Sequence, residues 1–257
     1  MTIYMKTEKR PVREAPMSAA ERKARVELAA AYRIFDMLGW SLLIFNHITM
    51  RVEGPEPRFL INPFGLHYSE ITASSLLLVD LEGNVLRESS WPVNRAGFVI
   101  HSALHASQPQ AHCIMHTHTT NGVAVACLRE GLSPHNFYGA MLQGQVAYHD
   151  FEGITVEPGE KERLVRDIGD KRAVILRNHG LLSWGPSVAQ AFLTLWTLQQ
   201  ACDVQIAAAA AGALHPVTSQ AIAQSVRESG QGEKRTCDDV FAALVRLLDA
   251  KDPSYKN

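Results

Sequence analysis

The stretch that decides both the fold and the chemistry of this chain reads AHCIMHTHTT and runs from Ala111 to Thr120. Its apolar centre, residues 113–115, predicts a short buried strand. Side chains alternate across a strand, so we expect His116 and His118 to project to the same side. Two neutral imidazoles at one end of a strand are able to bind a divalent metal ion. The alternative is a pair of polar residues that end the strand and form hydrogen bonds to nearby backbone.

A third histidine supports the metal interpretation. His179 lies just beyond the apolar run at 173–176, which predicts another buried strand, and residues 181–184 predict its partner. Three protein ligands leave coordination positions open, as in catalytic zinc sites. Gly180 would permit a close backbone approach or a positive φ, and Asn178 could orient a ligand through a hydrogen bond.

The composition is that of a globular protein with enough apolar residues for a full core. The chain has 257 residues, 46% of them hydrophobic and 20% charged, and a formal net charge of -1. This charge gives no electrostatic reason to expect nucleic acid or an acidic membrane as a partner, and no apolar run is long enough to cross a bilayer. The first 16 residues lack a hydrophobic signal core, so we expect a flexible arm and a cytoplasmic protein. Four scattered cysteines fit reduced, mostly buried thiols there; they are Cys113, Cys127, Cys202 and Cys237.

Helical and strand-like patterns alternate along the rest of the chain. Ser18 and Glu21 have capping-box spacing and predict a helix that ends near Leu38. The other predicted helices are 97–107, 121–129, 159–168, 187–211 and 238–248, the last after a polar link at 225–236. The other predicted strands are 41–52, 58–62, 76–81 with a return at 85–86, and 145–148. This order predicts one layered α/β domain over residues 17–257, after the arm at 1–16. The absence of GxGxxG and P-loop motifs gives no support to a nucleotide-binding fold.

Several further histidines have two interpretations each. His101 and His105 are four residues apart on a predicted helix, which is a ligand spacing, but we expect one to be buried and hydrogen-bonded and the other exposed. His149 could carry a proton and be oriented by Asp150, or it could be structural. His47 follows Asn46 in what could be a substrate-binding loop.

These residues together resemble the class II aldolase/adducin family from about Ser18 to Ala211. The matching segments are Phe45–Thr49, Phe59–Leu66, His101–His118 and Asn178–Gly180. The resemblance implies a single-domain three-layer α/β/α fold with a central, mostly antiparallel sheet. It also implies a divalent metal ion held by His116, His118 and His179, with zinc expected and manganese, cobalt or iron as alternatives. A homotetramer with active sites between subunits is common in the family.

The chain departs from the aldolases of that family at three positions. Those enzymes place a glutamate about nineteen residues before the first histidine of the HxH, and Gly97 stands there in this chain. Phe64 stands where the sugar-phosphate aldolases have a threonine, and Ala96 where they have a small hydroxyl residue. Arg95, beside it, could bind a carboxylate or phosphate through its planar guanidinium, or could be a solvated residue at a helix start.

The sequence therefore predicts a metal-dependent carbon–carbon lyase that acts on a small hydroxy- or oxo-carboxylate or carbonyl compound, by decarboxylation or retro-aldol cleavage. In the family, such cleavage proceeds through a metal-stabilised enolate. The catalytic candidates are His47 and Arg95, and the substrate-binding candidates are Asn46 and Gly65. Two alternatives stay open: a non-catalytic, adducin-like interaction module, and an isomerase or dehydratase that uses the same intermediate.

Overall fold

The computed structural model describes residues 17–53, 56–153, 159–229 and 233–257. The predicted arm at 1–16 lies outside the described residues.

One sheet of seven strands forms the centre of the molecule, in the order β3-β2-β1-β4-β7-β6-β5. Neighbouring strands are antiparallel except for the parallel pair β5 and β6. This confirms the expected mostly antiparallel sheet. The strands are β1 (Ile48–Val52), β2 (Arg58–Ile61), β3 (Leu77–Asp80), β4 (Cys113–Thr117), β5 (Val146–His149), β6 (Ala173–Leu176) and β7 (Gly180–Gly185).

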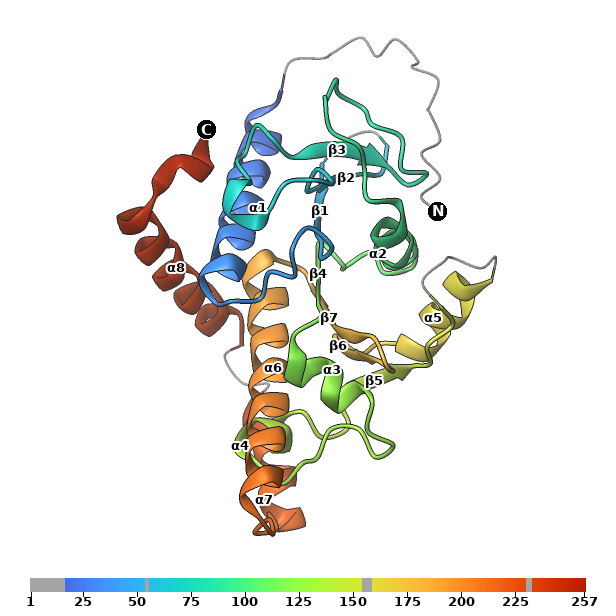
Figure 1. Cartoon of the computed structure of the whole chain (residues 1–257), viewed down its shortest axis with the longest axis vertical. Coiled ribbons are helices and arrows are strands. Elements are labelled where there is room, and N and C mark those ends of the chain that lie inside the picture. The colour runs from blue at the N-terminus through green and yellow to red at the C-terminus, as the bar shows by residue number, and fades with distance from the viewer. Residues whose placement is uncertain (1–16, 54–55, 154–158, 230–232) are drawn as a thin grey trace.

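Helices cover both faces of this sheet, which Figure 1 shows nearly edge-on. On one side lie α1 (Ala19–Met37), α6 (Val188–Ala211) and α8 (Glu233–Lys251), and on the other lie α2 (Arg95–Ser107) and α5 (Glu160–Ile168). The shorter elements are η1 (Tyr68–Glu70), α3 (Thr120–Ala126), α4 (Phe137–Met141), α7 (Ser219–Ser229) and η2 (Pro253–Lys256). The predicted three-layer α/β/α arrangement is confirmed. Among the described residues, none of these helices is both long and apolar enough to span a bilayer.

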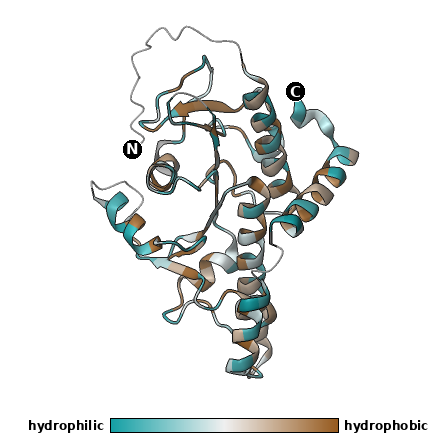
Figure 2. Cartoon of the chain, turned by 180° about the vertical axis from the view of Figure 1, so that it is seen from behind, coloured by the Kyte–Doolittle hydropathy of each residue, from teal (hydrophilic) through white to brown (hydrophobic). Residues whose placement is uncertain are grey.

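The strand β4 shows why the layers form. Cys113 and Met115 belong to the core cluster that includes α1 and α6, whereas Ile114 belongs to the cluster that includes α5. This alternation is the two-residue period of a strand buried on both faces. In Figure 2, β3 and the upper part of α6 are mainly hydrophobic and α5 is largely hydrophilic, while α8 carries hydrophobic and hydrophilic residues together. By the same period, His116 shares the face of Ile114, towards α2 and α5.

Strand register brings several loops to one end of the sheet. Ile48, the first residue of β1, lies opposite Met115 near the end of β4. Thr117 pairs with Leu181 near the start of β7, and Gly180 in turn pairs with Leu176 at the end of β6. The segment before β1, the segment after β4 and the turn between β6 and β7 therefore meet.

Some local predictions were wrong. Val85 forms an isolated bridge to Val79 and not a return strand. The expected polar link overlaps α7, a mainly polar helix without buried residues. Ser18 does cap α1 by accepting from the backbone N–H of Glu21. Glu21 does not complete the box, because its carboxylate binds Arg25 and Arg87, each at 2.9 Å.

Candidate metal centre

Three histidines converge at the end of the sheet where these loops meet. His116 is on β4, His118 is the first residue after β4, and His179 lies in the turn between β6 and β7. One ring nitrogen from each lies within 4.8 Å of the other two. The Nε2 atoms of His116 and His118 are 2.6 Å apart. The two-residue period and the strand register thus bring together the residues that the sequence selected.

The orientation of His116 is fixed by the backbone of β7. Its Nδ1 lies 2.8 Å from the carbonyl oxygen of Leu181, which can only accept a hydrogen bond. The Nδ1–H therefore donates, and the neutral ring presents an unprotonated Nε2 to His118. A backbone carbonyl that holds one nitrogen of an imidazole while the other faces its ligand is the usual arrangement around metal-binding histidines.

Burial keeps these rings neutral at physiological pH. It lowers the pKa of His116 well below its ordinary value, and the neighbouring His118 and His179 lower it further. Burial, followed by His179, lowers the pKa of His118 to about 4, and burial also lowers the pKa of His179. Because a metal ion binds the neutral imidazole, the donor set is in the form that a divalent cation requires. Three neutral, converging nitrogens fit such an ion.

Two backbone features of the β6–β7 turn permit this convergence. Asn178 has a positive φ of 56°, so the left-handed turn residue is the asparagine and not Gly180. A Cβ on Gly180 would lie 2.9 Å from Cδ2 of His118 and still closer to the carbonyl oxygen of Thr117. Gly180 is therefore needed for the close approach of β7 to the histidine-bearing strand. Asn178 is exposed and forms the turn.

The structure places His47 beside the three-histidine cluster. His47 is buried, with its ring centroid 5.5 Å from that of His116 and 4.1 Å from that of His101. Asn46 is also buried, and its Nδ2 donates to the carbonyl oxygen of Trp40 at 3.2 Å. Its Oδ1 has no hydrogen-bond partner among the described residues. A ligand that reaches this loop would find that oxygen available.

The other two candidate positions are less informative. Gly65 is exposed, has a φ of 115°, and would bring a Cβ within 3.0 Å of the Trp91 ring. Its local backbone and this contact are sufficient to explain the glycine. Arg95 is the first residue of α2, and its side chain lies outside the described part of the structure.

A second group of histidines lies on the same face of the sheet. Both His101 and His105 are buried, so the expectation that one would be exposed was wrong. Both contact the hydroxyl of Thr49, at 2.8 Å from His101 Nδ1 and 2.8 Å from His105 Nε2. Sequence reasoning did not select Thr49. The available signal was its polar side chain between Ile48 and Met50, two apolar residues on the opposite face of β1.

The carboxylate partner of His149 differs from the one considered in the first of its two interpretations. Its Nδ1 lies 2.8 Å from a carboxylate oxygen of Asp167 on α5, and not of Asp150. The partner comes from an element eighteen residues further along the chain, which sequence adjacency does not reveal.

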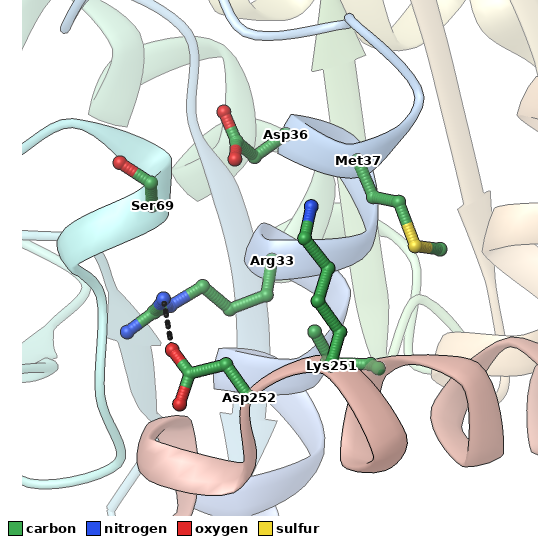
Figure 3. A pocket seen from close by; sticks show the side chains of 7 residues that line it. Arg33, Asp36, Met37, Ser69, Lys251 and Asp252 are labelled. Atoms are coloured by element: carbon green, nitrogen blue, oxygen red, sulfur yellow. Dashed lines mark hydrogen bonds and ion pairs between the residues drawn. The ribbon is translucent and has the colours of Figure 1, made fainter.

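Two cavities lie on the side of α1 and α8. A cavity of about 180 Å³ is bounded by Arg33 of α1 and by Asp252, whose side chains are 3.3 Å apart (Figure 3). A larger groove of about 720 Å³ is mainly apolar and includes Val26, Phe241 and Val245 in its lining. None of the clustered histidines lines either cavity.

Comparison with known proteins agrees with this fold. The model of the Class II Aldolase and Adducin N-terminal domain matches residues 26–206. A protein from Caulobacter vibrioides named as a candidate class 2 aldolase is 43% identical over 241 residues, which are 93% of this chain and 94% of that protein. Alpha-adducin from Rattus norvegicus is also 43% identical, over 89% of this chain but 33% of its own length.

Solved structures give the same result. An aldolase II superfamily protein from Pseudomonas syringae is 41% identical, with a TM-score of 0.91 over 94% of this chain and 98% of that one. An L-fuculose 1-phosphate aldolase from Glaciozyma antarctica is 30% identical, with a TM-score of 0.82 over 96% of this chain and 97% of that one. The chain therefore belongs to the class II aldolase and adducin family.

Proposed function

We propose that this protein is a metal-dependent carbon–carbon lyase that cleaves a small hydroxy- or oxo-carboxylate or carbonyl compound. The observation that carries the proposal is the convergence of three neutral imidazoles within 4.8 Å, with Gly180 leaving space for the approach of the strands. The Nε2 atoms of His116 and His118 are 2.6 Å apart, and two unprotonated nitrogens approach so closely only with a proton or a cation between them.

His116, His118 and His179 would hold the divalent ion, with zinc favoured by the all-nitrogen donor set. When bound, such an ion polarises the oxygens of a carbonyl substrate and stabilises the negative charge left by bond cleavage. The Leu181 carbonyl orients His116, and the burial of His116 limits the access of water to its ring.

The neighbouring side chains would bind and orient the substrate. Asn46 has a buried oxygen available, and His47 lies against both His101 and the cluster. Gly97 supplies no acid or base, which favours decarboxylation, because release of CO₂ does not require a base to remove a hydroxyl proton. Binding of the substrate carboxylate by the guanidinium of Arg95 stays a prediction.

The first experiment measures metal content and products together. Protein reconstituted with zinc, manganese, cobalt or iron is expected to retain about one ion per chain, and we would screen small hydroxy- and oxo-acids for release of CO₂ or an aldehyde. An isomerised or dehydrated product in place of these would move the assignment to the isomerase or dehydratase alternative. Stoichiometric metal with no turnover of any kind would contradict the lyase.

A second candidate function is a non-catalytic interaction module. It is favoured by the 43% identity to alpha-adducin together with glycine at the position of the aldolase glutamate. Substoichiometric metal after careful reconstitution would support the module.

We also propose a cytoplasmic homo-oligomer, a tetramer as in many members of the family. Large apolar side chains near the site are exposed, among them Phe45 at 50% and Phe151 at 49%, and the Phe151 ring lies 6.1 Å from that of His179. Burial of such side chains by a neighbouring subunit would be favourable. Light scattering on the purified protein measures the number of subunits, and a monomer at micromolar concentration would contradict this assembly.

A further inference from the structure

A continuous chain of contacts links the backbone before β4 to the interior of the site. The carbonyl oxygen of Ala111 lies 2.9 Å from His105 Nδ1, and His105 Nε2 lies 2.8 Å from the Thr49 hydroxyl. The same hydroxyl lies 2.8 Å from His101 Nδ1. All four groups are buried, so water does not compete for these hydrogen bonds.

The direction of every hydrogen bond in this chain follows from its first member. A carbonyl oxygen only accepts, so His105 Nδ1 carries a proton. Burial, with the charge of Arg51, lowers the pKa of His105 to about 3, so the ring is neutral and its Nε2 must accept from Thr49. The Thr49 oxygen has thereby donated its only proton and accepts from His101 Nδ1–H. His101, neutral as well, is left with an unprotonated Nε2.

That nitrogen is buried and has no hydrogen-bond partner among the described residues. A buried acceptor without a donor is destabilising, which points to a donor that arrives from outside the chain. His101 is in ring contact with His47, whose ring in turn lies near His116. His116 is only 2% exposed, whereas His118 and His179 are half-buried, so the cluster extends from the surface to the depth at which His47 and His101 lie.

We propose that His101 Nε2 accepts a hydrogen bond from a hydroxyl group of the substrate, and that the Ala111–His105–Thr49 relay holds it in the accepting tautomer. The proposal rests on the proposed function, and it selects α-hydroxy compounds over the same compounds without the hydroxyl.

The tautomer is tested first, because this measurement requires neither metal nor substrate. Long-range ¹H–¹⁵N correlation spectra of protein labelled at histidine distinguish protonated from unprotonated ring nitrogens, and His101→Phe assigns the signals. We expect His101 to be protonated at Nδ1 and unprotonated at Nε2 in the wild type and in Thr49→Ser, which keeps the hydroxyl. Thr49→Val, of similar volume but without the hydroxyl, is expected to lose this fixed tautomer. A wild-type His101 protonated at Nε2 would overturn the relay.

The ligand is tested with glycolate and acetate, two small carboxylates that differ by one hydroxyl. By calorimetry on the zinc-loaded protein, we expect glycolate to bind roughly three- to tenfold more tightly than acetate, the range of one neutral hydrogen bond. His101→Phe, shown by metal analysis to retain zinc, is expected to lose this preference, as is Thr49→Val, while Thr49→Ser keeps it.

The outcomes separate this proposal from the lyase proposal. Zinc binding with an equal affinity for the two acids, or a glycolate preference that persists in His101→Phe, would overturn the acceptor role and leave the metal site in place. A protein that binds no zinc would overturn the proposed function together with the substrate role, and the tautomer spectra would still decide whether the relay exists.

Discussion

Two groups of histidines on the same face of one sheet differ in what their ring nitrogens contact. In the relay, both nitrogens of His105 and one of His101 are used by a hydroxyl or a backbone carbonyl. In the cluster, His116 Nδ1 donates to the carbonyl oxygen of Leu181, and His116 Nε2 lies 2.6 Å from His118 Nε2. Two ring nitrogens at this distance need a proton or a cation between them. Burial alone does not separate the groups, since His101, His105 and His116 are all buried. The contacts of the ring nitrogens do separate them, and they are the reason why the proposed metal site is the cluster and why the relay has a structural role.

The largest effect is expected from His179→Ala. Removal of one of three ligands from an open site should reduce metal retained after reconstitution to well below one ion per chain, with little change in folding, because His179 is a turn residue. Metal analysis and circular dichroism measure the two properties. The matched control is His105→Leu, which removes an imidazole of the relay that is not a proposed ligand. This variant should keep the metal. Full occupancy in His179→Ala would remove this residue from the ligand set.

Gly180→Ala tests whether the approach of the strands shapes the cluster. The added Cβ would contact His118 Cδ2 and the Thr117 carbonyl, so we expect a loss of about 3 kcal/mol in the free energy of unfolding and weaker metal binding. Gly144→Ala is the control without steric contact, because nothing lies within 4 Å of a Cβ there; its φ of 70° is left-handed, so only backbone strain is expected. Gly144→Ala should lower the free energy of unfolding by only about 1 kcal/mol. Equal losses in urea denaturation would show that steric contact at Gly180 is not the cause.

His105→Leu is expected to affect stability and its pH dependence. Loss of the ring leaves the Ala111 carbonyl and the Thr49 hydroxyl without their partner, at a cost of about 2 kcal/mol near pH 7. In the folded wild type His105 stays neutral down to about pH 3, whereas in the unfolded chain it binds a proton near pH 6.5. Its stabilising contribution is thus complete above pH 6.5 and is lost as the pH falls towards 3.

The difference in the free energy of unfolding between the wild type and His105→Leu should therefore shrink as the pH falls from 6.5 towards 3. Chemical denaturation at several pH values measures this difference. A constant difference from pH 7 to pH 4 would contradict the assignment of a neutral, buried His105.

The smallest expected effect is a gain of activity in Gly97→Glu. On the family resemblance, this substitution restores the acid of the aldolases, and we expect weak aldol cleavage of small hydroxyketone phosphates that the wild type lacks. Gly97→Gln is the control, since it has a similar size and no acid. The Gly97→Glu variant could instead keep one metal ion per chain and cleave the native substrate more slowly. This result would show that the new carboxylate fills a coordination position already used by substrate.

The elements with a strong local pattern could be predicted from the sequence. Short apolar runs such as residues 173–176 identified the strands, and the predicted limits Ser18 and Leu38 are the caps of α1. Helices α7 and α4 were not predicted, because α7 has no buried residue and α4 has only five residues, of which the small Gly139 and Ala140 are buried. At the site, the three metal candidates were identified because each follows a recognisable strand. Thr49, Asp167 and the burial of His105 were not, because each depends on an element distant in sequence.

The sequence by itself determined the family, the layered α/β fold and the identity of the three converging histidines, since two-residue alternation and strand ends are local properties of the chain. Tertiary structure alone decided what each remaining imidazole nitrogen contacts: His101 and His105 share the hydroxyl of Thr49, and His149 binds Asp167. The physical reason is that a hydrogen-bond partner is selected by proximity in the folded sheet, and strand register brings together residues that are tens of positions apart. The direction of each hydrogen bond, and with it the free nitrogen of His101, follows from those partners.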